Sequence, residues 1–141
     1  MSFDLRFHPP FNLMVHGISN SGKTYWVRNF LTLKHVLCSS NSSNVILFYK
    51  MMQPVYDEMV KDKLIQKAVD VSSEFPTIQE IHTMIEPYQN KGGSMIIFDD
   101  VMSELSTLKN FEQIFCNMSH HVNCSVLFLT QNLFHQAKPY R

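Results

Sequence analysis

The chain has 141 residues, of which 45% are hydrophobic, and this length and composition predict one domain with a substantial core. Twelve basic and twelve acidic residues give zero formal net charge, so charge alone does not indicate a nucleic-acid-binding protein. The chain contains no apolar run of ~20 residues and no signal peptide, so we expect a soluble, intracellular protein. Its three cysteines form no CxxC pair, which argues against a disulfide scaffold.

The first predicted strand, residues 11–15, leads into a phosphate-binding loop (Walker A motif). The loop reads Gly-Ile-Ser-Asn-Ser-Gly-Lys-Thr over residues 17–24, and a helix is predicted from residue 25 to about 34. Glycines at both ends of the loop let backbone amides face phosphate oxygens, and the helix directs its positive dipole end at the same anion. Lys23 can then reach the β- and γ-phosphates, and Thr24 can offer its hydroxyl to Mg²⁺.

This loop predicts ATP and Mg²⁺ as cofactors. Ile18 and Asn20 stand where many such loops carry Pro or Gly, although Asn tolerates left-handed backbone angles better than most residues. The predicted nucleotide-binding residues are those of the loop and the one that follows it: Gly17, Ser19, Asn20, Ser21, Gly22, Lys23, Thr24 and Tyr25.

Beyond the loop helix, strands and helices alternate. A polar segment of turn formers over residues 38–44 separates the first helix from the next strand. Further strands are predicted at residues 45–49, 68–71, 94–100 and 125–130, and helices at residues 54–60, 77–89 and 111–120. Thr77, with Glu80 three residues later, is predicted to cap its helix. The alternation predicts an α/β fold, a parallel sheet with helices on both faces and ligands at the carboxyl ends of its strands.

Two adjacent carboxylates follow one of these strands. Asp99 and Asp100 come after four apolar residues, as in a Walker B motif, and lie where the phosphates should sit if the strands are parallel. Asp99 would bind Mg²⁺ directly or through a water, and Asp100 would accept a proton from an attacking water or orient it. A strand that ends in a solvated acidic turn is the alternative.

The last predicted strand ends in Thr-Gln-Asn. If this strand lies between the loop strand and the Asp99 strand, Gln131 emerges between the γ-phosphate and Asp100. A neutral amide there could sense the γ-phosphate and help to position the water. The predicted catalytic residues are therefore Lys23, Asp100 and Gln131, with a polar C-terminal turn as the alternative for Gln131.

These motifs, together with the segments at residues 48–59, 98–104, 119–121 and 129–136, resemble a known family. The chain is similar over nearly its whole length to the genome-packaging ATPases of large DNA viruses and of Maverick-type (Polinton or adintovirus-like) elements, in the FtsK/HerA branch of the P-loop superfamily. The resemblance implies a single RecA-like P-loop ATPase domain over residues 1–141. It also implies that Lys23 and Thr24 bind ATP and Mg²⁺, Asp99 binds the metal, Asp100 is the catalytic acidic residue and Gln131 the sensor.

The resemblance further implies a homo-oligomeric ring that pumps double-stranded DNA into a preformed capsid. Capsid or portal proteins would be partners, no membrane would be involved, and the protein would act in the host nucleus or cytoplasm or with the virion.

Two departures qualify this transfer. Asp100 stands where many members of the branch have Glu and is one methylene shorter, so it would act through a second water. Relatives also continue past the position of Arg141 with at least one more strand. We therefore expect the final part of the sheet to be missing, and the chain alone to hydrolyse ATP poorly and form no stable ring.

Two other functions remain open from the sequence. A small nucleotide or metabolite kinase would need a lid with arginines, and the arginines number only three: Arg6, Arg28 and Arg141. A degenerate nucleotide-binding fragment, serving as an interaction module without activity, is the other.

Some residues carry a further alternative reading. Arg28 could serve a neighbouring subunit as an arginine finger, although a solvated arginine on a helix is more common. A zinc site is a less favoured interpretation of four further residues, because their spacing fits no common zinc pattern. These residues are Cys116, His120, His121 and Cys124.

Overall fold

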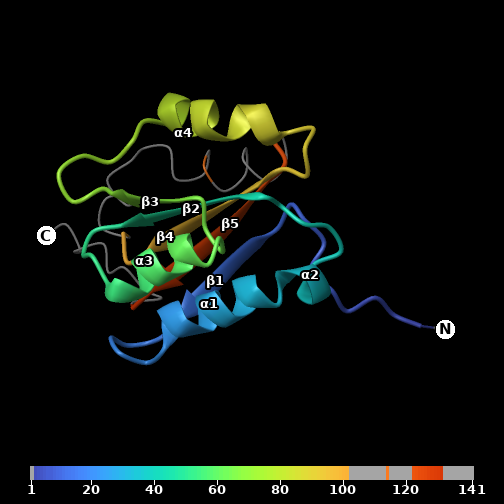
Figure 1. Ribbon diagram of the computed structural model, residues 1–141, viewed down its shortest axis with the longest axis horizontal. Coiled ribbons are helices and arrows are strands. Elements are labelled where there is room, and N and C mark those ends of the chain that lie inside the picture. Colours follow the sequence, from blue (N-terminus) through green and yellow to red (C-terminus); the bar gives the residue numbers. More distant parts are fainter. Residues whose placement is uncertain (1, 102–113, 115–121, 132–141) are drawn as a thin grey trace, which may run out of the picture.

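Five parallel strands form the centre of the structure, a computed structural model that describes residues 2–101, 114 and 122–131. In spatial order the strands of this described part are β1 (Asn12–His16), β5 (Cys124–Thr130), β4 (Ser94–Asp99), β2 (Asn44–Tyr49) and β3 (Lys67–Asp70). Every neighbouring pair is parallel. Figure 1 shows the strands running side by side between helices.

Helices cover both faces of this sheet, so the α/β class predicted from the sequence is confirmed. α1 (Lys23–Thr32) and α3 (Pro54–Lys61) lie on one face, and α2 (Lys34–Leu37) follows α1 (Figure 1). α4 (Ile78–Ile85) and the short 3-10 helix η1 (Glu86–Tyr88) lie on the other. None of the helices in the described part of the chain is both long and apolar enough to cross a membrane.

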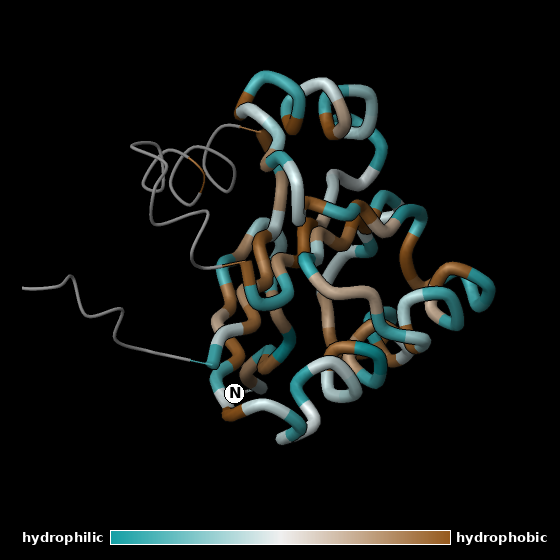
Figure 2. Tube along the Cα trace, turned by 90° about the vertical axis from the view of Figure 1, so that its left-hand side faces the viewer, coloured by the Kyte–Doolittle hydropathy of each residue, from teal (hydrophilic) through white to brown (hydrophobic). Residues whose placement is uncertain are grey.

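Two hydrophobic clusters fill the space on the two faces of the sheet. Successive strand residues point to opposite faces, so Met95 and Ile97 of β4 pack in the cluster under α1 and α3, while Ile96 and Phe98 pack in the cluster under α4. Figure 2 shows the most continuous hydrophobic stretches on the strands between the helical layers. The same alternation directs Asp99 to the face that α1 and α3 cover.

The observed helices differ from the predicted ones mainly at their ends. α1 begins at Lys23, two residues early, and ends where Leu33 has φ −97° and ψ 8°. The helix predicted over residues 77–89 divides into α4 and η1. Its predicted cap is confirmed, because the backbone N–H of Glu80 donates to Thr77 Oγ1 at 3.2 Å and that of Thr77 to Glu80 Oε2 at 2.7 Å. The helix predicted over residues 111–120 lies outside the described residues, apart from position 114.

Candidate nucleotide site

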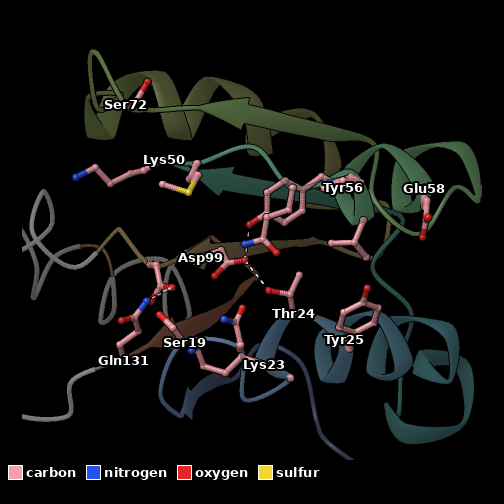
Figure 3. Close-up of a pocket in the computed structure, with 17 residues that line it drawn as sticks. Ser19, Lys23, Thr24, Tyr25, Lys50, Tyr56, Glu58, Ser72, Asp99 and Gln131 are labelled. Carbon is pink, nitrogen blue, oxygen red and sulfur yellow. Dashed lines mark hydrogen bonds between the residues drawn. The ribbon is translucent and has the colours of Figure 1, made fainter.

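A cleft of about 890 Å³ lies at the carboxyl edge of the sheet (Figure 3). Its lining comes from the predicted phosphate-binding loop, the start of α1, the β2–α3 connection, the start of α3 and residues that follow β3, β4 and β5. Ligands of open parallel sheets bind at this edge. Most of the predicted site residues line the cleft: Ser19, Asn20, Gly22, Lys23, Thr24, Tyr25, Asp99, Asp100 and Gln131.

The backbone of the loop has the special conformation that the sequence predicted. Asn20 has φ 60° and Gly22 has φ 94°, both in the left-handed region that favours Asn and Gly. A Cβ on Gly17 would lie 2.4 Å from Ser21 Oγ, so a side chain at residue 17 would force the hydroxyl of Ser21 to move. The N–H of Gly17 donates to the carbonyl of Thr130 at 3.1 Å, which fixes the start of the loop to the end of β5.

Lys23, the first residue of α1, directs its side chain back into the loop. Only 8% of Lys23 is exposed, and Nζ donates to the carbonyl oxygens of Gly17 at 2.6 Å and Ile18 at 3.1 Å. The first amides of a helix have no partner within the helix and carry its positive dipole end. The loop therefore gathers a buried ammonium and helix N–H groups, which is a suitable environment for phosphate.

Asp99 meets the start of α1 from the end of β4. Thr24 Oγ1 donates to Asp99 Oδ2 at 3.0 Å, and the buried hydroxyl of Tyr56, from α3, donates to the same oxygen at 2.5 Å (Figure 3). Burial raises the pKa of the Asp99 carboxyl above its ordinary value, although the hydrogen bonds from the hydroxyls of Tyr56 and Thr24 oppose this rise. The charge of the neighbouring Asp100 adds to this rise in pKa, and the charge of Lys23 opposes it. Burial, followed by the charge of Asp99, raises the pKa of Tyr56 well above its usual range.

The donors around Asp99 fit Mg²⁺. This ion takes oxygen ligands, uses one or two carboxylates, and completes its shell with waters and substrate phosphates. Thr24 and Asp99 supply such oxygens next to the phosphate-binding loop. Within the part of the chain that the structure describes, no group of three or more His, Cys, Asp or Glu residues could hold a metal by itself. The arrangement thus suits a cation shared between protein and phosphates.

Asp100 and Gln131 lie beside this pair. β5 lies between β1 and β4, which is the arrangement on which the prediction for Gln131 depended. Gln131 Nε2 donates to Asp100 Oδ2 at 3.0 Å. Asp100 has φ 55°, uncommon for a residue with a side chain, and its N–H donates to the carbonyl of Leu129 at 3.0 Å.

The residues alone predicted the helix that contains Tyr56 but did not identify Tyr56 as part of the site. The available signal is positional: a tyrosine at the start of the helix that follows β2, the strand paired with the Asp99 strand. Tyr25, by contrast, lines the cleft with 62% of its surface exposed.

The structure also places Arg28 and one of the four residues of the zinc interpretation. Arg28 joins α1 to α3 by donating to Glu58 Oε2 at 2.8 Å and to Asp62 Oδ2 at 3.5 Å. Cys124 is buried on β5 in the cluster under α4, and burial raises the pKa of its thiol to about 12. The other three residues of the zinc interpretation lie outside the described residues.

One comparison with known proteins identifies a relationship. The family model described as "Poxvirus A32 protein" matches residues 3–140, which include the loop, the two carboxylates and Gln131. A search of curated proteins gives no match.

Proposed function

This chain belongs to the poxvirus A32 protein family, a family of viral genome-packaging ATPases, and on that premise we propose that it is a P-loop motor domain coupling ATP hydrolysis to movement of double-stranded DNA. The proposed reaction converts ATP and water to ADP and phosphate. The observation that carries the proposal is the convergence of Thr24 from the loop helix and Asp99 from β4 in one cleft, with Asp100 and Gln131 beside them.

The phosphate-binding loop would hold the triphosphate. Lys23 would exchange the carbonyls of Gly17 and Ile18 for oxygens of the β- and γ-phosphates, which keeps its hydrogen bonds and adds attraction between opposite charges. Backbone amides of residues 19–25 would contact the remaining phosphate oxygens.

Thr24 and Asp99 would hold Mg²⁺ beside these phosphates. The bound ion would neutralise charge that develops on the β- and γ-oxygens during transfer. Asp99 supplies a buried carboxylate, and Thr24 fixes its orientation through the 3.0 Å hydrogen bond.

Asp100 and Gln131 would act on the attacking water. Asp100 would accept its proton or orient it, and the amide of Gln131, already 3.0 Å from the carboxylate of Asp100, would connect that base to the γ-phosphate. Because the amide of Gln131 is neutral, it adds no charge beside Asp100 that would compete for the metal.

The family also supports a wider set of proposals. We place the chain in the FtsK/HerA branch, close to the packaging ATPases of Maverick-type elements, because of the segments at residues 48–59 and 129–136. Double-stranded DNA would be the translocated partner, identical subunits would form a ring, and capsid or portal proteins would anchor it. Since the formal net charge is zero, the contact with DNA would rest on a local surface.

Phosphate release from ATP tests this proposal. The wild-type protein, with Mg²⁺, should release inorganic phosphate slowly, as expected for the chain alone, and should release it faster when double-stranded DNA is added. Asp100→Asn should bind ATP equally well and release none. Transfer of the γ-phosphate to an added nucleotide or metabolite would instead indicate a kinase. ATP binding without any release of phosphate would indicate a degenerate nucleotide-binding fragment, and a lack of ATP binding would contradict the proposal.

A further inference from the structure

The hydroxyl of Tyr56 is buried against the carboxylate of Asp99. Tyr56 is 1% exposed and Asp99 3% exposed, and the Oη–Oδ2 distance is 2.5 Å. Figure 3 shows Tyr56 and Thr24 reaching Asp99 from opposite sides of the cleft. Both hydroxyls donate to Oδ2, so Oδ1 receives neither of them. These two hydrogen bonds to one oxygen hold the carboxylate in one orientation.

The start of α3 holds Tyr56 in this place. Gln53 is extended, Pro54 begins the helix, and the N–H of Tyr56 donates to the carbonyl of Gln53 at 3.0 Å. The ring of Tyr56 packs against that of Tyr49, with 5.0 Å between centroids. α3 is anchored in the core by further buried side chains, among them Met59. The hydroxyl is therefore pre-positioned by packing, before any ligand binds.

We propose that Tyr56 is a positioning residue for Mg²⁺, which holds Oδ2 of Asp99 so that Oδ1 is presented to the metal or to a water bound to it. This inference rests on the proposed function, because it needs a nucleotide-bound metal at Asp99. It assigns a role to the segment at residues 48–59, which neither the phosphate-binding loop nor the two carboxylates explain.

A purely structural role makes a different prediction. The ring of Tyr56 fills space next to Tyr49, and phenylalanine would fill it equally well. If packing were the whole role, Tyr56→Phe would behave as wild type in every assay of metal binding. If the hydroxyl positions the carboxylate, the same variant keeps its fold and its metal-free affinity for ATP but needs more Mg²⁺.

The test is a titration of Mg²⁺ at a fixed, low concentration of a fluorescent ATP analogue, with a second titration of the analogue in excess chelator. For Tyr56→Phe, we expect the Mg²⁺ concentration at half-maximal binding to rise about tenfold, since one hydrogen bond to a charged group is lost. Affinity for the analogue in chelator should stay within twofold of wild type. Tyr49→Phe is the matched control, because its ring is the neighbour of Tyr56 and it should titrate as wild type.

Three results would overturn the inference. An unchanged Mg²⁺ titration for Tyr56→Phe would show that the hydroxyl does not serve the metal. A loss of metal-free binding in that variant would show that the hydroxyl serves the fold. Failure of the wild-type protein to bind the analogue with or without Mg²⁺ would contradict the proposed function itself, and the inference with it.

Discussion

Replacing Lys23 by alanine should weaken ATP binding roughly 150-fold. Lys23 is the cation that the loop directs inward, and its Nζ makes two hydrogen bonds, at 2.6 and 3.1 Å, to Gly17 and Ile18. Two charge-assisted hydrogen bonds to phosphate in their place contribute about 1.5 kcal/mol each at the low end, so their loss costs about 3 kcal/mol. At about 1.4 kcal/mol for each factor of ten, this gives the stated loss of affinity.

Equilibrium binding of a fluorescent ATP analogue with Mg²⁺ measures this loss. Lys61→Ala is the control, because Lys61 is an exposed lysine in the last turn of α3 and does not line the cleft. It should bind the analogue as wild type does. An affinity of Lys23→Ala within threefold of wild type would refute the reasoning, since the phosphates would then not lie against the side chain of Lys23.

Three further predictions concern Asp100, Gln131 and the glycine that precedes β4. Asp100→Asn should keep ATP and Mg²⁺ binding but stop turnover, because an amide cannot accept the proton of the water; hydrolysis at the wild-type rate would exclude Asp100 as the base. Gln131→Ala removes the 3.0 Å hydrogen bond to Asp100 and should lower turnover about tenfold with unchanged ATP affinity, whereas a parallel loss of affinity would place Gln131 in ground-state binding instead. Gly93→Ala should destabilise the protein by about 3 kcal/mol in urea unfolding, because φ is +74° and the new Cβ would lie 2.4 Å from the carbonyl oxygen of Asn123; a loss below 1 kcal/mol would contradict this.

The three central strands and the phosphate-binding loop could be predicted from the sequence because each has a strong local cause. β2, β4 and β5 are nearly continuous apolar runs, as expected for strands buried on both faces. The loop depends on two glycines and on Asn20, a residue type that tolerates the φ of 60° found there. The cap at Thr77 is equally local, since it involves two residues three positions apart.

Contacts between distant segments could not be predicted in the same way. The hydrogen bond between Thr24 and Asp99 joins residues 75 positions apart in the sequence. The hydrogen bond between Gln131 and Asp100 requires β5 to lie between β1 and β4. The sequence states neither strand order nor register, so the second contact was conditional. Tyr56 shows the same limit more clearly, because nothing local distinguishes a tyrosine that packs from one that reaches a carboxylate.

The most direct test of the account is a structure of the protein with Mg²⁺ and a non-hydrolysable ATP analogue. We expect the triphosphate to lie along the loop, with Lys23 on the β- and γ-phosphates and the metal held by Thr24, Asp99 and the phosphates. We also expect the γ-phosphate to lie on the side of Asp100 and Gln131. A nucleotide bound elsewhere, or in this cleft with its phosphates away from Lys23, would contradict the central claim that this loop and these carboxylates form one ATP site.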